Sequence, residues 1–272
     1  MSALSLRLRL HVDALAARER NADLESAAGY IESAFSHAGL EPRSHYFQSG
    51  GRRVRNVEAG EASPIVVGAH YDTVPGSPGA DDNASAVAVL IELAAMRLPA
   101  RFIAFANEEM PYFHTAEMGS QVWAKQARER GERIAAMFSL EMLGYYSDAP
   151  GSQTYPPLLR FFYPERGNFI AFVADLGAWR LLRDSLRLFR KCSTFPSQGL
   201  AAPAFVPGIT RSDHWSFRRH GFPALMVTDT AYHRNPHYHL PSDTPEKLDY
   251  ERMSQVTLGL AGMLRELANQ TR

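Results

Sequence analysis

The sequence has 272 residues, of which 45% are hydrophobic and 21% charged, as in ordinary globular proteins. Lys plus Arg equals Asp plus Glu at 29 each, so no excess of one charge favours nucleic acid or acidic lipid as a partner. The single cysteine, Cys192, excludes an internal disulfide framework and is compatible with a reducing compartment. No apolar run reaches the roughly 20 residues that span a bilayer, and the Arg-containing N-terminus has no signal-peptide pattern. We therefore expect a cytoplasmic protein that binds neither nucleic acid nor a membrane.

Apolar residues at helical spacing alternate along the chain with short apolar runs that are typical of buried strands. The turn Gly50-Gly51 separates two short strands, and Gly39 is placed to end a helix. In chain order we expect helices 4–20 and 24–38, strands 43–48, 53–58 and 65–68, helix 84–96, strand 101–106, helix 120–130, strand 134–140, an irregular segment 144–163, strand 169–173, helix 181–189, strand 203–208, a short helix from 212, strand 223–228 and helix 249–268.

This alternation predicts an α/β fold with a central twisted, mostly parallel (mixed) sheet that is flanked by helices on both faces. No repeat, low-complexity tract or linker divides the chain, so we expect a single domain over residues 1–272. The helices within 1–40 are expected to pack on that domain. The loops within 144–210 are expected to shape a substrate cleft.

Four of the expected strands run directly into residues that bind metals or move protons. These residues are His70, Glu108 with Glu109, Glu141 and Asp229. In sheets of this kind, ligands bind in the crevice beyond the carboxyl ends of the strands. We therefore expect these side chains to share one cleft.

Two patterns around the loop after residue 68 have both a functional and a structural interpretation. His70 and Asp72 fit a metal-binding imidazole that a carboxylate orients, although such a pair also occurs as a purely structural contact. Asp81 and Asp82 precede a helix, where acidic residues cap the first turn and interact with the helix dipole. Two adjacent aspartates exceed what a cap needs, so a metal ligand stays an equal alternative.

The acidic pair Glu108-Glu109 is harder to explain structurally, because it directly follows an apolar strand. In an extended chain, adjacent side chains point to opposite sides. One glutamate can then bind a metal while its neighbour reaches a water molecule on that metal. Glu141 repeats the arrangement at the end of another strand.

Three histidines, His233, His237 and His239, lie within seven residues, and this density favours a ligand among them without indicating which one. The run Ser212-Asp213-His214 contains the residue types of a serine-hydrolase triad. However, Ser and His two positions apart on one short segment are poorly placed for that mechanism, and no Gly-x-Ser-x-Gly motif occurs.

Histidines and carboxylates at strand ends, without clustered cysteines, favour a hydrolytic zinc centre. The number of carboxylates is compatible with two adjacent ions at the roughly 3.5–4 Å spacing of co-catalytic sites. Zinc is therefore the expected cofactor.

Several short motifs in a fixed order resemble the co-catalytic (two-zinc) aminopeptidase family of zinc metallopeptidases, which is related to glutaminyl cyclases and glutamate carboxypeptidase-like proteins. The resemblance runs from about Ile65 to Tyr250. It implies the phosphorylase/hydrolase-like architecture of zinc exopeptidases and peptide or aminoacyl-amide substrates. Its motifs are Ala-His-Tyr-Asp at 69–72, Gly-Ala-Asp-Asp-Asn-Ala-Ser at 79–85, Asn-Glu-Glu at 107–109, Gly-Ser at 119–120, Glu-Met-Leu-Gly-Tyr at 141–145, Arg-Ser-Asp-His at 211–214, and Tyr-His at 238–239 followed by Ser-Asp-Thr.

The motifs imply a set of metal ligands. One zinc ion would be held by His70, Asp81 and Glu141. The other would be held by Asp81, Glu109 and His239, so that Asp81 is the expected bridge between the two ions.

The motifs also imply the residues that act on the substrate. Glu108 would be the general base, and Asp72 would orient the first histidine ligand. Tyr238 matches a residue that polarises the scissile carbonyl or its oxyanion, and Arg211 falls where relatives place a residue near the substrate. The resemblance thus predicts a zinc-dependent aminopeptidase that cleaves N-terminal peptide or amide bonds.

The sequence departs from the family pattern in a few places. Glu141 stands where many relatives carry Asp, which affects contacts to the substrate amine. The stretches 110–118, 146–167 and 195–208 match no motif of the family and are expected to shape specificity.

Two other functions remain open at this point. A glutaminyl cyclase-like acyltransferase would use one zinc ion, but such relatives typically replace the second Asp of the pair, which is intact in Asp81-Asp82-Asn83. A non-catalytic family member that serves as an interaction module would lose ligands or the base, and this chain retains them.

Overall fold

The computed structural model describes residues 1–156 and 159–271, so positions 157 and 158 of the expected irregular segment and residue 272 lie outside the described part. Within it, the strands are β1 (Arg43–Ser49), β2 (Arg52–Gly60), β3 (Ile65–His70), β4 (Arg101–Phe105), β5 (Ala136–Glu141), β6 (Ile170–Asp175), β7 (Ser197–Ala202) and β8 (Ala224–Thr228). The α-helices are α1 (Ala3–Leu15), α2 (Leu24–His37), α3 (Ala86–Ala95), α4 (Gly119–Glu129), α5 (Trp179–Cys192), α6 (His214–Arg219) and α7 (Tyr250–Thr271).

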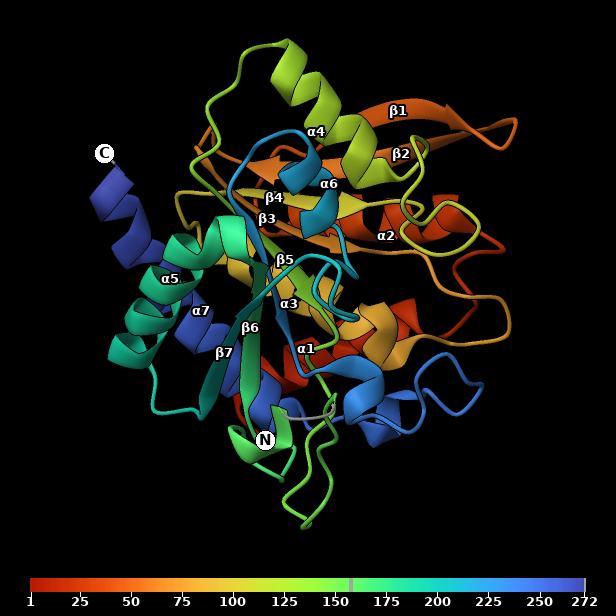
Figure 1. Ribbon diagram of the computed structural model, residues 1–272. Coiled ribbons are helices and arrows are strands. Elements are labelled where there is room, and N and C mark those ends of the chain that lie inside the picture. The colour runs from red at the N-terminus through yellow and green to blue at the C-terminus, as the bar shows by residue number, and fades with distance from the viewer. Residues whose placement is uncertain (157–158, 272) are drawn as a thin grey trace.

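All eight strands form one sheet in the order β1-β2-β4-β3-β5-β8-β6-β7 (Figure 1). The central strands β4, β3, β5 and β8 are parallel to one another. The hairpin β1-β2 joins β4 in antiparallel orientation, and β6 reverses direction against β8 while β7 runs parallel to β6. The predicted mixed, mostly parallel α/β sheet is confirmed.

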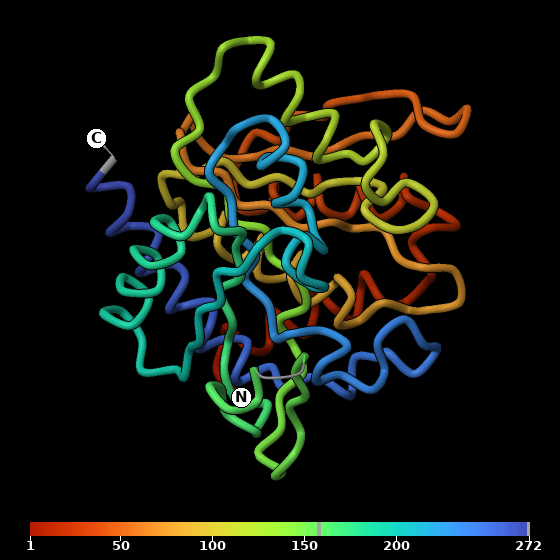
Figure 2. The backbone as a smooth tube through the Cα atoms, viewed as in Figure 1, coloured from red at the N-terminus to blue at the C-terminus, as the bar shows by residue number. Residues whose placement is uncertain are grey.

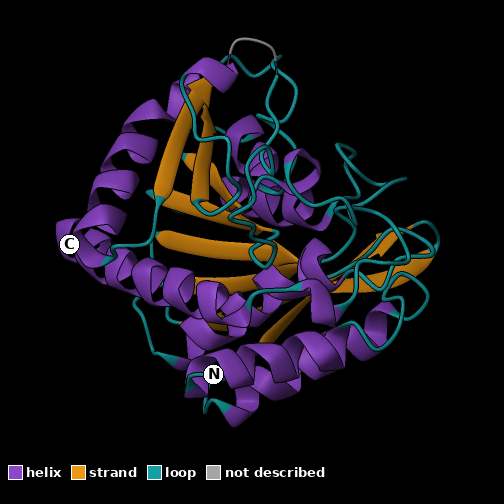
Figure 3. Ribbon diagram, turned by 90° about the horizontal axis from the view of Figure 1, so that it is seen from below, coloured by secondary structure: helices purple, strands orange, loops and turns teal. Residues whose placement is uncertain are grey.

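Side chains of the central strands alternate between two apolar layers. In β3, Ile65 and Val67 face the layer that α1, α2, α3, α5 and α7 complete, whereas Val66 faces α4 and α6. This period of two is the direct consequence of the pleat. Because both faces of these strands are covered, their sequences are apolar throughout, as is usual for parallel strands. Figure 3 shows the twisted sheet between its helices.

The described residues between β5 and β6, 142–156 and 159–169, form no strand or α-helix, and Figure 2 draws this part of the chain in green. The N-terminal helix α1 packs against the C-terminal helix α7 and against α3. None of the helices among the described residues combines the length and apolar composition needed to cross a bilayer.

Three local predictions differ from the structure. The first helix ends at Leu15 instead of continuing to residue 20. The helix expected from residue 84 begins at Ala86, after a distorted turn over 80–85. The strand expected at 203–208 is wrong: the edge strand β7 occupies Ser197–Ala202, and residues from 204 form turns in which Phe205 is 86% exposed. Small residues in β7 hid this strand, because only backbone pairing with β6 defines it.

A buried carboxylate ties the β1-β2 hairpin to α4. Glu58 of β2 accepts hydrogen bonds from Arg43 (2.6 Å) and Trp123 (3.1 Å) and pairs with His45 (2.9 Å). Burial alone would raise the pKa of Glu58, but the contacts of His45 and Trp123 and the charge of Arg43 lower it to about 2. The ionised form therefore stabilises the fold.

We expect Glu58→Gln to lower the free energy of unfolding at pH 7 by about 2 kcal/mol, because charged hydrogen-bond partners are lost in the interior. Since the pKa in the folded protein lies below the ordinary value, this stabilisation is complete above about pH 4.5 and is lost as the pH falls toward 2. Urea unfolding of both proteins at pH 7 and near pH 3.5 measures the difference. Glu129→Gln, which removes an exposed pair with Lys125, is the control and should cost less than about 0.5 kcal/mol. A cost at position 58 that does not change with pH would contradict the assignment.

Candidate metal centre

The candidate site lies at the edge where the parallel central strands end. His70 is the last residue of β3, and Glu141 is the last residue of β5. The chain beyond β4 reaches Glu108 and Glu109 within four residues of Phe105. Because β3 pairs with both β4 and β5, these side chains come from neighbouring strands and converge on one spot.

Two histidines and one aspartate form the centre of the cluster. His70 Nε2 lies 3.3 Å from one carboxylate oxygen of Asp82, and His239 Nε2 lies 3.1 Å from the other. Glu141 lies 3.5 Å from His70 Nε2, and Glu109 lies 3.2 Å from His239 Nε2. Asp82 therefore belongs to two groups of three potential ligands, one around each histidine.

Two polar atoms that face the centre of this cluster, Asp82 Oδ1 and His239 Nε2, are buried without a hydrogen-bond partner among the described residues. Burying such atoms is costly unless a partner compensates them. Carboxylates also outnumber the histidines, so the cluster has the charge that a cation would balance. Imidazole nitrogen with carboxylate oxygen is a donor set that zinc accepts. The residues present thus fit the metal that the sequence predicts.

The pKa values of the cluster reflect its burial. Burial raises the pKa of Glu108 well above its ordinary value, and that of Glu109 to about 7. Burial would lower the pKa of His70, but nearby Glu141 and Glu108 raise it, and contacts with Asp82 and Glu109 raise that of His239 to about 10. A cation bound among these groups would favour their deprotonated forms, so metal binding would release protons.

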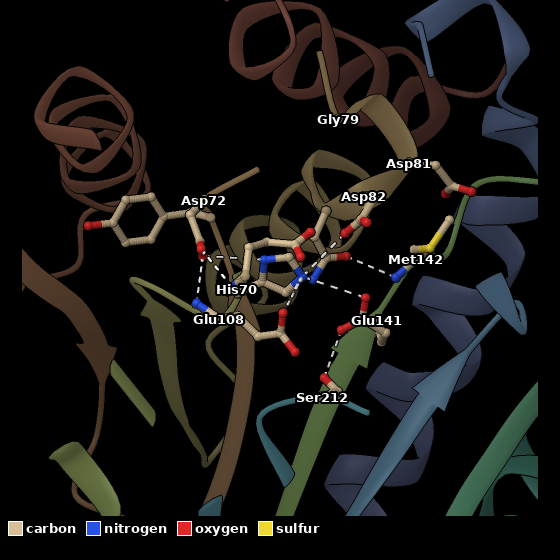
Figure 4. Close-up of polar contacts among 12 residues, drawn as sticks. His70, Asp72, Gly79, Asp81, Asp82, Glu108, Glu141, Met142 and Ser212 are labelled. Carbon is tan, nitrogen blue, oxygen red and sulfur yellow. Dashed lines mark hydrogen bonds and ion pairs between the residues drawn. The ribbon is translucent and has the colours of Figure 1, made fainter. Parts of the chain in front are cut away.

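Asp72 holds the backbone of Glu108 and Glu109 in place, and Figure 4 shows its contact with Glu108. Its carboxylate accepts the backbone N–H groups of Glu108 (3.0 Å) and Glu109 (2.9 Å). The same group lies 3.4 Å from His70 Nδ1, on the side of the ring opposite to the cluster. The sequence indicated the contact with His70, but not the two backbone bonds.

Asp81, the expected bridge, lies outside the cluster. Its carboxylate accepts hydrogen bonds from Gly144 N (2.8 Å) and Asn235 Nδ2 (2.7 Å), and Figure 4 shows it apart from His70. Asp82 occupies the place between the histidines instead. The reason is local: Asp82 leaves the helical conformation (φ −102°, ψ 89°), so the two adjacent side chains point to different sides. The expected role of Asp81 is therefore corrected to Asp82.

Other residues fix the ligands without belonging to the cluster. Ser212 Oγ donates to Glu141 Oε2 at 2.7 Å, which gives the Ser212-Asp213-His214 motif an orienting contact. Asp243 accepts the backbone N–H groups of Asp81 (3.0 Å) and Asp82 (3.1 Å). Asn83 bridges Leu140 O and Met142 N around the end of β5. The Ser-Asp-Thr motif at 242–244 was the available signal for Asp243.

Tyr238 and Arg211, the expected substrate contacts, flank the cluster. The Tyr238 ring stacks on the His239 ring with centroids 3.7 Å apart. Burial and the neighbouring carboxylates raise the pKa of Tyr238, so its hydroxyl stays protonated. Arg211 lies 5.8 Å from the centre of the Tyr232 ring. Asp229, the fourth strand-end residue, binds Tyr145 N and Ala231 N and lies outside the groups of potential ligands.

An apolar cavity of about 110 Å³ opens beside the cluster. Its floor is formed by Ala171 and Val173 of β6 and Met226 of β8. These side chains point to the same face of the sheet as α6. Residues 153–156, 159 and 163 of the segment after β5, together with residues 206–209 and 211, form its walls. Glu141, Arg211 and Tyr238 also line it, so the cavity connects directly with the candidate metal centre.

This fold and this donor set together define a hydrolase of the zinc metallopeptidase class. The chain belongs to peptidase family M28, whose model matches residues 53–263. The family resemblance predicted from the motifs is confirmed.

Two relatives are similar to this chain over different shares of their own length. The uncharacterized protein YfbL of Escherichia coli (strain K12) is 39% identical over 264 residues, which cover 89% of this chain and 80% of YfbL. A probable leucine aminopeptidase of Arthroderma otae is 27% identical over 224 residues, 77% of this chain and 55% of that protein. The chain thus spans about half the length of this fungal relative.

Solved structures share the fold. LapB from Legionella pneumophila superposes with a TM-score of 0.75 at 23% identity, covering 97% of this chain and 72% of that chain. A glutaminyl cyclase of Fimbriiglobus ruber superposes with a TM-score of 0.67 at 19% identity, covering 97% and 96% of the two chains. At these identities the likeness concerns the fold, so the chemistry has to be argued from the site.

The two aspartates give a direct test of the geometry. We expect Asp82→Asn to weaken zinc binding about tenfold or more, because one of its oxygens faces each histidine. Asp81→Asn, the matched control next to it, should retain the zinc content of the unmodified protein. Metal analysis after dialysis against a weak chelator measures both. The opposite pattern, with zinc lost only from the position 81 variant, would restore Asp81 as the ligand.

Proposed function

We propose that the protein is a two-zinc aminopeptidase that hydrolyses the N-terminal peptide or amide bond of its substrate. His70, Asp82 and Glu141 would hold one ion, and Asp82, Glu109 and His239 the other. The observation that carries the proposal is the position of Asp82, with one oxygen 3.3 Å from one histidine and the other 3.1 Å from the second. A bridging carboxylate of this kind is what two adjacent cations require.

Zinc bound there supplies Lewis acidity to the scissile carbonyl and makes water nucleophilic near neutral pH. Glu108 is the proposed general base: its carboxylate takes the proton of the attacking water and delivers it to the leaving nitrogen. Support comes from its place beside the ligands, with Oε2 4.0 Å from His70 Nε2, and from its burial. Nearby cations favour the ionised carboxylate that this role needs.

Two other side chains complete the proposed mechanism. Asp72 positions Glu108 and Glu109 through their backbone N–H groups and orients the ring of His70. Tyr238, which is neutral over the working pH range, donates its hydroxyl proton in a hydrogen bond to the oxyanion of the substrate. Arg211 would contact the substrate at the rim of the cavity.

The cavity beside Glu141 is the proposed site for the side chain of the N-terminal residue. Aliphatic residues form its floor and Tyr155, Tyr163 and Phe169 line its walls, so apolar side chains gain most from entering it. Peptides with a large apolar N-terminal residue are therefore the proposed substrates.

A glutaminyl cyclase activity is the second candidate. The observation that favours it is the fold, because the chain superposes on the Fimbriiglobus ruber glutaminyl cyclase with a TM-score of 0.67. Against it stands the presence of two groups of potential ligands that share Asp82, since a cyclase with one zinc ion requires one such group. A non-catalytic role is disfavoured by the retained base and ligands.

The base is tested by Glu108→Gln, which should lower kcat by about 10²–10⁴-fold because proton transfer is lost. Zinc content should stay unchanged, since Glu108 belongs to neither of the two ligand groups that share Asp82. Release of p-nitroaniline from amino-acid p-nitroanilides measures turnover, and Glu61→Gln, an exposed acid, is the control. Full activity of the position 108 variant would contradict the mechanism. Conversion of N-terminal Gln to pyroglutamate without peptide hydrolysis by the unmodified protein would select the cyclase.

The cavity is tested by Ala171→Phe, which fills its floor. We expect kcat/KM for Leu and Phe substrates to fall about 10–100-fold relative to Ala substrates, since the larger side chains no longer fit. The ratio within one variant controls for general damage, and Leu176→Ala, on the exposed surface after β6, is the matched control. An unchanged ratio would show that the N-terminal side chain binds elsewhere.

A further inference from the structure

Arg20 lies in the segment between α1 and α2, outside the residues 53–263 that the family model matches. Only 3% of its surface is exposed. A guanidinium carries five N–H donors and no acceptor, so in the interior it needs several oxygen partners. The partners of Arg20 therefore show what it is buried to do.

The guanidinium of Arg20 donates to five backbone carbonyl oxygens. These belong to Leu15 (3.1 Å), Tyr71 (2.7 Å), Pro78 (3.0 Å), Gly79 (2.9 Å) and Asp82 (3.3 Å). Four of the five acceptors lie within residues 71–82. This is the segment that connects His70 to Asp82, so one side chain binds both ends of it and its middle.

The connecting segment has little regular structure of its own. It contains two prolines and two glycines between residues 73 and 80 and forms neither helix nor strand there. Such a segment has many conformations to lose when it becomes ordered. Bonds from a single buried cation to several of its carbonyl oxygens restrict it without regular hydrogen bonding.

Gly79 shows how closely the segment is folded over Arg20. The residue has φ +63°, which favours glycine. A Cβ atom there would lie 2.8 Å from Arg20 Nη2 and 2.2 Å from Asp82 O. The backbone is therefore in direct contact with the guanidinium where it approaches Asp82.

The charge of Arg20 also acts on the site. Burial lowers its pKa to about 10, and Asp82 and Asp72 act in the opposite direction, so the group is charged at neutral pH. This fixed positive charge lies next to the backbone of Asp82 and offsets part of the repulsion among the carboxylates before any cation binds.

We infer that Arg20 is a positioning residue that holds the segment from His70 to Asp82 in the conformation that binds metal. The N-terminal segment, although outside the matched family region, thereby contributes to metal affinity. The inference rests on the proposed role of His70 and Asp82 as ligands. Arg20 contacts neither substrate nor metal and acts through the backbone of the loop.

The variants Arg20→Lys and Arg20→Gln test this role. A lysine keeps the charge but offers three donors around one atom, which cannot reach carbonyl oxygens spread over the loop as the planar guanidinium does. We expect both variants to bind zinc about 10–100-fold more weakly, measured by competition with a chromogenic chelator. Saturating zinc should restore most of kcat with KM unchanged, because the substrate contacts remain.

Arg97 provides the matched control. It also donates to backbone carbonyl oxygens, those of Ala38 (3.0 Å) and Gly39 (2.7 Å), but it joins α2 to the end of α3 far from the ligands in the fold. Arg97→Gln should leave zinc affinity unchanged. Gly79→Ala disturbs the contact between residue 79 and Arg20 from the side of the loop, because the added Cβ atom would lie 2.8 Å from Arg20 Nη2. It should weaken zinc binding as the Arg20 variants do, and it tests the contact if one of those variants does not fold.

Hydrogen exchange of the metal-free proteins separates this inference from the proposed function. Amides of residues 71–82 should exchange faster in the Arg20 variants, whereas those of the central strands should not change. If the unmodified protein binds no zinc, the proposed function fails, but the exchange result still tests whether Arg20 holds residues 71–82 in place. Folded Arg20 variants with unchanged zinc affinity and unchanged exchange over 71–82 would overturn the inference.

Discussion

Asp82 presents one carboxylate oxygen to each of two histidines, and much of the surrounding structure serves to keep it there. Its backbone N–H binds the Asp243 carboxylate at 3.1 Å, and its carbonyl oxygen accepts from Arg20 at 3.3 Å. The next residue, Asn83, is tied to both sides of the β5 terminus. A side chain this constrained loses little freedom when a cation binds, which favours affinity.

The constraint has an electrostatic cost, because buried like charges repel one another and lose their hydration. The chain reduces this cost because the neighbouring carboxylates accept hydrogen bonds from groups of the protein. Asp72 accepts two backbone N–H groups, Ser212 donates to Glu141, and Asp81 accepts from Gly144 and Asn235. Within the cluster, Asp82 Oδ1 and His239 Nε2 stay buried without a hydrogen-bond partner among the described residues. These are the atoms that a bound cation would compensate.

The sequence alone predicted the parts of this arrangement that depend on periodicity. The apolar strands before His70, Glu108 and Glu141 could be identified, and parallel strands must end at a common edge. The choice between Asp81 and Asp82 could not, because it depends on one backbone conformation within a distorted turn. Strand β7 escaped detection for a related reason, since its small residues have no pattern and pairing with β6 alone defines it. Long-range bonds such as those of Arg20 leave no signal in local spacing.

The fold by itself does not decide between peptidase and cyclase, because it superposes on a zinc aminopeptidase of Bacillus subtilis as well as on a glutaminyl cyclase. The antiparallel orientation of β6 against β8 bears more directly on the substrate than the overall fold does. It places part of the sheet beside Glu141 under irregular segments, and the apolar cavity forms there. A glutaminyl cyclase acts within the N-terminal glutamine of its substrate, so its site needs room for one glutamine side chain and a single cation. Two groups of potential ligands that share Asp82 and an aliphatic floor at Met226 exceed these needs. Both features support the proposed hydrolysis of peptides that begin with an apolar residue.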